Sequence, residues 1–357
     1  MSNKIMEIDT KEFKNNIFKI KEYVGKDVTI MPIIKANGYG TYINQNLELI
    51  KNFNIVGVAT VDEGCFIRKL GFENEIFILN QPTLEEIEKI IQSNLIIGIA
   101  SEEFFKCLNN YKVNFKVHLE IETGMGRTGI DPNDIQKFLD NIGENITIEG
   151  IYSHLSSADI DKEYSNKQIE IFKTIVEKIE NKIGKIKYKH ISGSNGIVNF
   201  KESYFNLVRP GISIYGYKSE EKMYEKLDVK PIAKLKSKIS FIKEIEEGTS
   251  ISYSRSFISD RKMKVATVTI GYADGVKRSL SNVGDVVVNG EKAKIIGNIC
   301  MDSFMIDITD INDVKEGDFV YIWDNEKITL EEIAEQCNTI NYEIISTISD
   351  RVKREFI

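Results

Sequence analysis

The sequence predicts an α/β protein, in which a (β/α)8 barrel of the TIM type is followed by a mostly β C-terminal domain. Short apolar runs alternate with helix-forming stretches up to about Pro231, and closely spaced strands follow it. Strand-then-helix repeated about eight times is typical of a closed parallel barrel. We therefore expect a barrel over residues 1–230 and a β domain over residues 231–357. The first residues, to about position 8, could pair with the second domain.

The apolar runs give the expected strands of the barrel, because short runs bounded by polar residues are typical of buried parallel strands. In chain order they are Thr29–Ile34, Ile55–Ala59, Ile76–Leu79, Leu95–Ile99, Phe115–Ile121, Ile148–Ser153, Tyr188–Ser192 and Phe205–Arg209. Amphipathic stretches lie between them. The clearest has apolar residues at helical spacing, namely Ile169, Phe172, Ile175, Val176 and Ile179.

The second part of the chain predicts strands with turn signals and little helix. They are Lys264–Ile270, Asp285–Val288, Ala293–Ile296, Phe304–Ile308 and Phe319–Trp323. Asn289-Gly290 lies between two of these strands and favours a type I′ hairpin turn. One helix is expected near Leu330–Cys337.

Composition and charge exclude several classes of protein. The chain has 357 residues, of which 42% are hydrophobic and 28% charged, so it is long enough for a large barrel and a smaller domain. A net charge of −7 without a basic stripe argues against nucleic-acid binding. The start has no apolar signal segment and no run approaches a membrane span. The scattered cysteines and histidines argue against disulfides and zinc, so we expect a metal-free cytoplasmic protein.

Lys35 is the most informative single residue. It ends an apolar run and is followed by Ala36-Asn37-Gly38-Tyr39-Gly40, which reads as a loop. A lysine at the mouth of a buried strand is poorly hydrated, which favours its neutral amine and its use as a nucleophile. The alternative is a lysine whose stem covers apolar surface while its charge reaches water.

Four further side chains of unlike chemistry follow predicted barrel strands. Arg127 follows the fifth strand and His154 ends the sixth, while Ser194 follows the seventh and Arg209 ends the eighth. The C-terminal ends of barrel strands form the face where barrel enzymes keep their active sites. Packing alone does not explain such a set, so the sequence predicts an active site there.

The loops after the seventh and eighth strands favour a phosphate group. Residues 192–196 (Ser-Gly-Ser-Asn-Gly) precede a predicted short helix, and residues 209–212 (Arg-Pro-Gly-Ile) close the barrel. Hydroxyls, unhindered N–H groups and a helix N-terminus together suit a phosphate. A phosphate site combined with a strand-end lysine indicates pyridoxal 5′-phosphate (PLP), held by Lys35 as a Schiff base.

Residues 124–129 match the dinucleotide pattern GxGxxG, but the context is wrong. Such a fingerprint opens a helix directly at its third glycine. Here residues 130–133 intervene, and Pro132 marks the expected helix start. We therefore do not expect a dinucleotide site.

Eight segments, in order along essentially the whole chain, resemble motifs of the alanine racemase family. They are Ile33–Gly40, Glu122–Ile130, Ser153–Asp159, Asn206–Gly216, Ser250–Phe257, Thr269–Gly275, Gly297–Asp307 and Thr339–Arg354. The resemblance implies a PLP-dependent isomerase that interconverts L- and D-alanine and supplies D-alanine for peptidoglycan. It also implies a homodimer whose two active sites are shared between the subunits.

By this resemblance, Lys35 carries PLP and serves as one base, while Tyr253 of the partner subunit serves as the other. Racemisation removes a proton from one face of the substrate and returns one to the other, which suits two opposed bases. A histidine matching His154 links the tyrosine to the arginine matching Arg209. That arginine faces the pyridine nitrogen, to which a guanidinium can only donate.

The resemblance also implies a set of contacts around the cofactor and the substrate. The phosphate contacts are Tyr39, Ser194, Gly211, Ile212 and Tyr342. Arg127 and Met301 match positions near the substrate carboxylate, Met301 through its backbone N–H from the partner subunit. Tyr272 matches a tyrosine of the access channel.

Three positions depart from the family pattern. Glu120 stands where many members carry a carbamylated lysine, and we hypothesise that its permanent charge orients Arg127. Gly193 replaces an asparagine, and Thr41-Tyr42 replaces a His-Gly pair. These changes leave the substrate preference open, because a hydroxyl or methylene is weakly discriminated by apolar pockets.

Three alternatives therefore stay open. One is a serine or broad-specificity racemase of the same family. A PLP-dependent decarboxylase has a similar layout, but its motifs are not found near Lys35 or Cys300. A non-catalytic PLP-binding protein would lack the second domain.

Overall fold

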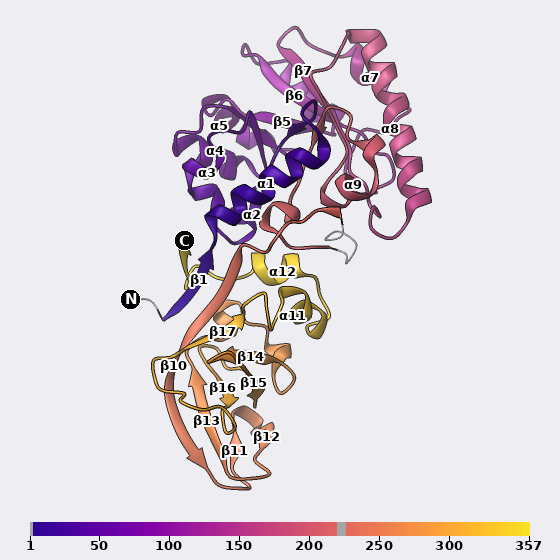
Figure 1. Cartoon of the computed structure of the whole chain (residues 1–357). Coiled ribbons are helices and arrows are strands. Elements are labelled where there is room, and N and C mark those ends of the chain that lie inside the picture. The colour runs from indigo at the N-terminus through magenta and orange to yellow at the C-terminus, as the bar shows by residue number, and fades with distance from the viewer. Residues whose placement is uncertain (1–2, 220–225) are drawn as a thin grey trace.

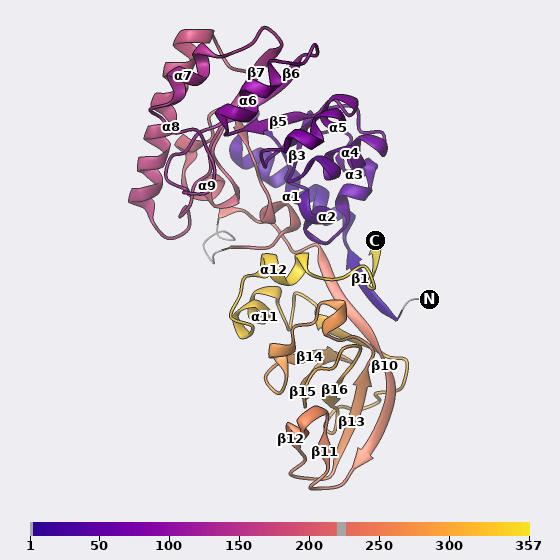
Figure 2. The same cartoon turned by 180° about the vertical axis from the view of Figure 1, so that it is seen from behind.

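The computed structural model describes residues 3–219 and 226–357, and it has the predicted two-part architecture (Figure 1). The barrel forms the upper part in this view and the β domain the lower part. A long strand, β10 (Ala233–Ile245), leaves the junction between them and runs the length of the β domain, as both views show (Figures 1 and 2).

Eight parallel strands of the barrel correspond to the eight predicted ones, with ends that differ by a few residues. They are β2 (Thr29–Ile30), β3 (Ile55–Val58), β4 (Glu75–Ile78), β5 (Ile96–Ile99), β6 (Phe115–Glu120), β7 (Ile146–Tyr152), β8 (Tyr188–His190) and β9 (Leu207–Val208). Strands β3 to β8 form one sheet and β2 pairs with β9. Backbone bonds from Ile34 N–H to Gly57 O (2.9 Å) and from Arg209 N–H to Ser192 O (2.9 Å) close the ring.

The first strand is shorter than predicted. Thr29–Ile34 was expected, but regular pairing stops at Ile30. Pro32 lacks an N–H group and so cannot donate to either neighbouring strand. Ile33 still donates to Pro210 O at 3.0 Å, so the chain continues along the barrel wall up to Lys35.

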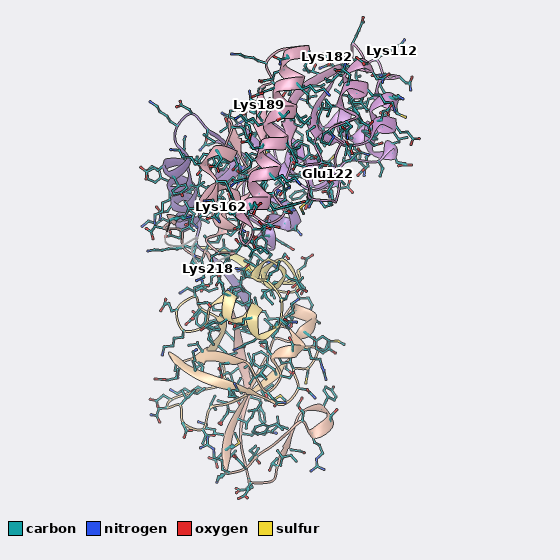
Figure 3. The ribbon with its side chains drawn as sticks, turned by 90° about the vertical axis from the view of Figure 1, so that its right-hand side faces the viewer. Lys112, Glu122, Lys162, Lys182, Lys189 and Lys218 are labelled. Atoms are coloured by element: carbon teal, nitrogen blue, oxygen red, sulfur yellow. The ribbon has the colours of Figure 1, made fainter. Side chains whose placement is uncertain are left out.

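Helices surround the barrel as expected from the alternating pattern, except that the segment labelled α2 is a left-handed turn at the barrel mouth. They are α1 (Thr10–Val24), α2 (Lys35–Tyr39), α3 (Leu47–Ile50), α4 (Val61–Lys69), α5 (Ile87–Gln92), α6 (Glu102–Leu108), α7 (Ile135–Asp140), α8 (Lys162–Ile183) and α9 (Ser194–Asn199). The apolar residues predicted at helical spacing are the buried stripe of α8. Its outer face carries charged side chains such as Lys162 and Lys182, labelled in Figure 3.

Two details of the prediction were wrong. The helix after residues 124–129 begins at Ile135 and not at Pro132, because Asp134 N–H returns to Asp131 O (2.9 Å) in a turn. Ser194 is already the first residue of α9 instead of preceding it. Isolated 3-10 turns lie at Ile43–Gln45, Leu84–Glu86, Lys201–Ser203, Ile212–Tyr215, Tyr253–Arg255, Tyr272–Asp274 and Arg278–Leu280.

The β domain is a closed antiparallel barrel built around β10. The sheet order runs β13-β16-β15-β14-β17-β10, and β10 also pairs with β13. The remaining elements are β11 (Ser250–Ile251), β12 (Phe257–Ile258), β13 (Met263–Val268), β14 (Asp285–Val288), β15 (Glu291–Ile296), β16 (Phe304–Asp307), β17 (Phe319–Trp323), α11 (Leu330–Gln336) and α12 (Asn341–Ser346). Asn289 and Gly290 have φ values of 49° and 77°, as a type I′ turn requires.

Both ends of the described chain join this sheet. Strand β1 (Lys4–Ile8) pairs antiparallel with β10, and β18 (Lys353–Phe356) pairs parallel with β1. Residues 1–2, which belong to the predicted N-terminal segment, lie outside the described residues. None of the expected strands covered β10, because Lys234, Lys236 and Lys238 interrupt its apolar residues. The expected strands were continuous apolar runs, whereas alternation of apolar and charged residues is typical of a half-buried strand such as β10.

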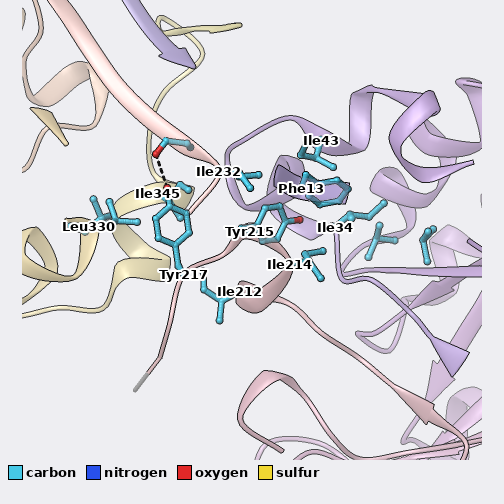
Figure 4. Packing of buried hydrophobic residues seen from close by; sticks show 14 of the residues in the cluster. Phe13, Ile34, Ile43, Ile212, Ile214, Tyr215, Tyr217, Ile232, Leu330 and Ile345 are labelled. Carbon is cyan, nitrogen blue, oxygen red and sulfur yellow. Dashed lines mark hydrogen bonds between the residues drawn. The ribbon is translucent and has the colours of Figure 1, made fainter. Parts of the chain in front are cut away.

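Apolar side chains fill the junction between the two parts (Figure 4). Phe13 and Tyr215 lie on the barrel side, and Leu330 and Ile345 on the side of the β domain, within one continuous buried cluster. Gly40 permits the close approach of α12. Its φ is 78°, and an added Cβ would lie 2.3 Å from Ile345 O. Across residues 3–219 and 226–357, no helix is long and apolar enough to cross a membrane.

Candidate active site

A cavity of about 450 Å³ opens at the C-terminal ends of the barrel strands. Its wall is formed by the segments that follow β2, β6, β7, β8 and β9, together with α12. It brings together nine of the predicted site residues. They are Lys35, Tyr39, Arg127, His154, Ser194, Arg209, Gly211, Ile212 and Tyr342.

Lys35 is followed by an unusual backbone. Residues 36–40 all have positive φ, with values near 52–60° from Ala36 to Tyr39, so they form a left-handed turn and not the ordinary loop expected. Left-handed helical geometry costs roughly 1–2 kcal/mol for each non-glycine residue. Glu63 stabilises the turn, because its carboxylate accepts from Ala36 N–H (2.6 Å) and from Ala59 N–H (2.8 Å). The turn therefore fixes where the Lys35 side chain leaves the backbone.

The surroundings of Lys35 favour its neutral amine. Burial lowers the pKa of Lys35, and the charge of Arg127 lowers it further; nearby Glu63 opposes the shift, while Arg209 adds to it. A neutral amine is the form that attacks a carbonyl or accepts a proton. The sequence had left a snorkelling lysine open, and its place in the cavity wall does not favour that alternative.

Arg209 is buried beneath the cavity and has no carboxylate partner among the described residues. One terminal nitrogen, Nη1, donates to His190 Nδ1 (2.7 Å) and His190 O (2.9 Å). The other, Nη2, donates to Ser153 O (2.7 Å) and His154 Nδ1 (3.0 Å). Among the described residues nothing accepts from its Nε. Burial lowers the pKa of Arg209 to about 10, so it remains a cation at neutral pH.

These contacts fix the protonation of two histidines. An arginine can only donate, so the Nδ1 atoms of His154 and His190 must carry lone pairs. Burial lowers the pKa of His154 to about 3, and Arg209, Arg127 and Lys35 act in the same direction. Burial lowers the pKa of His190 well below its usual range as well. Neutral His154 therefore carries its proton on Nε2, as a donor.

Ser194 forms the centre of a cluster of donors. Its Oγ accepts from Gly211 N–H (3.1 Å) and Ser213 N–H (3.3 Å), and it lies 3.0 Å from Ser213 Oγ. Hydroxyls and backbone N–H groups aimed at one point can bind phosphate oxygens. Tyr39 and Tyr342 flank the cavity, with ring centres 6.1 Å apart.

Arg127 and Glu120 occupy different environments. Arg127 is exposed at the rim of the cavity. Glu120 is 4% exposed and lies 3.1 Å from Tyr152 Oη, and in the described part of the chain it has no ion pair. Tyr152 also donates to Leu79 O at 2.8 Å. Burial and the charge of Glu120 raise the pKa of Tyr152, so it stays protonated.

The remaining predicted residues lie elsewhere. Tyr253, Tyr272 and Met301, which we call the exposed cluster, are on the β domain and do not line the cavity. They are 70%, 42% and 53% exposed. Asn298 Nδ2 donates to Tyr253 O (2.8 Å), and Ala273 N–H donates to Met301 O (3.0 Å), so their loops are connected.

Sequence reasoning missed three residues of the cavity surroundings. Glu63 sits in a Thr60-x-x-Glu63 capping box, a visible signal whose link to Lys35 depends on the fold. Tyr152 directly precedes Ser153-His154 at a strand end, so its position could have been noticed. His190 gave no signal beyond its place on a strand. In the described residues, no group of three or more His, Cys, Asp or Glu side chains could hold a metal ion.

Comparison with known proteins gives a consistent result. Residues 8–219 match the family described as alanine racemase, N-terminal domain, and residues 232–356 match alanine racemase, C-terminal domain. The alanine racemase of Halothermothrix orenii is 38% identical, over 98% of this chain and 96% of the relative. That of Methanococcus maripaludis is 34% identical, over 98% of both chains.

Solved structures agree with the sequence relatives. Alanine racemase from Clostridium difficile 630 superposes with a TM-score of 0.93 at 32% identity, covering 100% of this chain and 96% of the other. Alanine racemase from Bartonella henselae with covalently bound pyridoxal phosphate gives a TM-score of 0.90 at 30% identity, covering 100% of both. These relatives do not favour the serine racemase or decarboxylase alternatives. The chain belongs to the alanine racemase family, and its activity is the isomerisation of alanine.

Proposed function

We propose that the cavity holds PLP on Lys35 and that L- and D-alanine are interconverted by two bases, Lys35 and Tyr253 of a second copy of the chain. The observation that carries the proposal is Arg209, a buried guanidinium with no carboxylate partner among the described residues, beside a lysine whose pKa is lowered. The Nη atoms of Arg209 have acceptors, but among the described residues its Nε–H has none, and no carboxylate neutralises its charge. A ring nitrogen in the cavity would be such an acceptor.

The residues present fit PLP. Ser194 Oγ and the backbone N–H groups of Gly211 and Ile212, residues that line the cavity, would hold the phosphate. The Arg209 Nε–H group, which the protein leaves without an acceptor, would hold the pyridine nitrogen in its unprotonated form. When bound, PLP withdraws electrons from the α-carbon of the amino acid and so acidifies its α-proton.

Lys35 supplies the first base. Burial and the charge of Arg127 lower its pKa and so favour the neutral amine, which accepts a proton at Nζ. The left-handed turn of residues 36–40 holds the backbone beside it, which keeps the amine on one face of the substrate. Arg127 at the rim has a charge complementary to the substrate carboxylate.

The second base has to come from outside the cavity. Tyr253 is largely exposed, and so are its neighbours in the exposed cluster. Exposed aromatic residues and methionine are enriched at protein interfaces. We infer a homodimer in which this cluster covers the cavity of the other copy. His154 would then donate its Nε2 proton to the tyrosine oxygen and stabilise the anion formed when Tyr253 gives up its proton.

The cellular role follows from the reaction. D-alanine is the product that peptidoglycan synthesis would consume, and such an enzyme would work in the cytoplasm. Serine is the second candidate substrate, because the departures at Gly193 and Thr41-Tyr42 adjoin the cavity segments. The relatives compared above are alanine racemases by name, which makes serine the lesser candidate.

The test is racemisation of L-alanine and L-serine by the purified, PLP-loaded protein, followed by chiral chromatography, beside Lys35→Ala. We expect D-alanine to form much faster than D-serine, and the variant to lose at least about 1,000-fold in rate because both the attachment point and one base disappear. Faster serine racemisation would overturn the substrate, and an active Lys35→Ala would overturn the role of Lys35.

A further inference from the structure

Two buried histidines extend the contacts of Arg209 into the interior of the barrel. His190 Nδ1 lies 2.7 Å from Arg209 Nη1, and His190 Nε2 lies 2.9 Å from His118 Nδ1. Both imidazoles are fully buried. Neither ring lines the cavity, so neither can touch substrate or cofactor.

Arg209 fixes the donor and the acceptor of each hydrogen bond in this row of side chains. Because a guanidinium only donates, His190 must accept at Nδ1 and therefore carries its proton on Nε2. His190 then donates to His118 Nδ1, so His118 in turn carries its proton on Nε2. That last nitrogen is buried without an acceptor in the described residues. The opposite direction would place two donors face to face at Arg209.

The position of His118 is itself closely defined. Its ring stacks on Phe77, with centroids 4.4 Å apart and planes at 27°. An added Cβ at Gly150 would lie 2.3 Å from the ring, so the backbone of β7 fits directly against it. A buried N–H without a partner is costly, by a factor of roughly ten or more in folding equilibrium. The barrel retains the histidine despite this cost.

We propose that His118 is a positioning residue. Its Nδ1 accepts a hydrogen bond from His190 Nε2–H, which keeps the lone pair of His190 Nδ1 directed toward Arg209. This contact in turn orients the guanidinium for the cofactor. The orientation for the cofactor rests on the proposed function, whereas the His118–His190 and His190–Arg209 contacts concern only this protein. Without the acceptor at position 118, His190 would have a buried donor with no partner. Its ring would then turn or change tautomer, and Arg209 would lose a fixed contact.

The chain is well suited to a direct test, because it has only three histidines. The protein labelled with ¹⁵N-histidine should show, for each ring, one protonated nitrogen at Nε2 and one unprotonated nitrogen at Nδ1. The groups facing these rings are Arg209 and Lys187 for His118, and Arg209 and His118 for His190. Since these are cations or neutral rings, the pattern should hold through neutral pH. A protonated Nδ1 on His190 would overturn the proposal.

Variants at position 118 separate positioning from packing. His118→Leu removes the acceptor, and we expect mixed tautomers at His190 and about tenfold weaker PLP binding to the apoenzyme. His118→Asn offers an oxygen near the place of Nδ1 and should restore both. Tyr188→Phe is the matched control, because this barrel tyrosine contacts the His118 ring region but donates to Glu75 outside the chain of bonds.

The outcomes are distinct. If His118→Leu leaves the His190 signals and PLP affinity as in the wild type, the proposal is wrong. If Tyr188→Phe changes them equally, His118 acts only through packing and the proposal is also wrong. Where His118→Leu does not fold, the wild-type spectrum and His118→Asn still decide. Failure of the wild type to bind PLP would overturn the proposed function but leave the tautomer result standing.

Discussion

The barrel cavity and the exposed cluster of the β domain place the two proposed bases in opposite environments. Lys35 lies in a cavity whose polar groups are held by contacts within the same chain, such as Glu63 to Ala36 and Arg209 to His190. Tyr253 stands 70% exposed, with no part in that cavity. Both adjoin strained backbone, since residues 36–40 after Lys35 and Ser252 and Ser254 on either side of Tyr253 have positive φ.

The difference indicates a division of labour. A buried site can lower the pKa of a lysine and hold a cation such as Arg209 without any other chain. An exposed tyrosine keeps ordinary hydration and gains a defined chemical role only when another surface covers it. Under the proposed function, one chain would build the cofactor half of a site and present the other half outward.

Substitution of Tyr253 gives the largest effect that tests this comparison. Tyr253→Phe should slow racemisation roughly 100- to 10,000-fold, because one base is lost. In D2O, Lys35 should still exchange the α-proton of one enantiomer without inverting it. Chiral chromatography and mass spectrometry would detect both results. Tyr321→Phe, on a strand of the same domain, is the matched control, and equal losses in the two variants would contradict a specific role.

Mixing two inactive variants tests whether the halves come from different copies. Lys35→Ala and Tyr253→Phe each lack one base. Random pairing makes about half the dimers hybrid, and each hybrid contains one intact site, so about a quarter of wild-type activity should return. No recovery after exchange of subunits would mean that both bases act within one chain.

Acid should weaken the barrel through its histidines, whereas the β domain contains none. Burial lowers the pKa of His118 to about 3 in the folded state, against about 6.5 when unfolded. The unfolded chain thus binds the proton first, so stability is complete above pH ~6.5 and falls as the pH drops toward 3. We expect a loss of about 2 kcal/mol per such histidine at pH 5 relative to pH 8.

Urea unfolding at several pH values measures this loss. Trp323 fluorescence reports on the β domain, and far-UV circular dichroism on the helices of the barrel. His118→Asn removes one titrating group, so its free energy of unfolding should fall less between pH 8 and pH 5. An identical fall in variant and wild type would show that His118 does not contribute.

Most of this architecture was accessible from the sequence, for identifiable reasons. The barrel strands are continuous apolar runs, so periodicity located all eight of them. Strand β10 escaped because its lysines interrupt the apolar pattern, although their ammonium groups reach partners such as Glu7. The division of the chain after residue 230 stays a prediction.

The site, too, has a part that the sequence could predict and a part that it could not. Residues at strand ends, such as His154 and Arg209, could be placed by topology alone. Partnerships across the barrel could not, because the link from Glu63 to Ala36 and that from His190 to His118 join distant positions with no common motif. The left-handed turn after Lys35 was read as a plain loop, since Ala36 and Tyr39 are not typical of positive φ.

Substitution of Glu120 tests whether the barrel part of the site positions Arg127 without help from a second subunit. We propose that its charge orients Arg127, although the two make no ion pair in the described structure. Glu120→Gln keeps the size and removes the charge, and we expect the KM for alanine to rise about tenfold because a buried charge acts strongly on nearby cations. Steady-state kinetics would measure this. Glu149→Gln, at the opposite end of the barrel, is the control, and unchanged kinetics in Glu120→Gln would refute the hypothesis.

The smallest expected effect concerns the backbone that presents Tyr253. Ser252 has φ 66° and ψ −176°, a region that glycine occupies far more easily. Its Oγ donates to Asn298 O at 2.5 Å, and Asn298 donates back to Tyr253 O at 2.8 Å. Ser252→Gly should relieve the strain and stabilise the fold by about 1 kcal/mol, yet slow racemisation a few-fold because the loop loses a hydrogen bond.

Ser252→Ala separates the two causes, because it keeps the strain and loses only the hydroxyl. We expect it to be less stable than the wild type and to share the slower rate. Thermal unfolding and kcat of both variants give the comparison. If Ser252→Gly were less stable than Ser252→Ala, the strain at this position would be absent. If both kept full activity, the exposed half of the site would need no rigid loop, and contacts with the other subunit would suffice to position Tyr253.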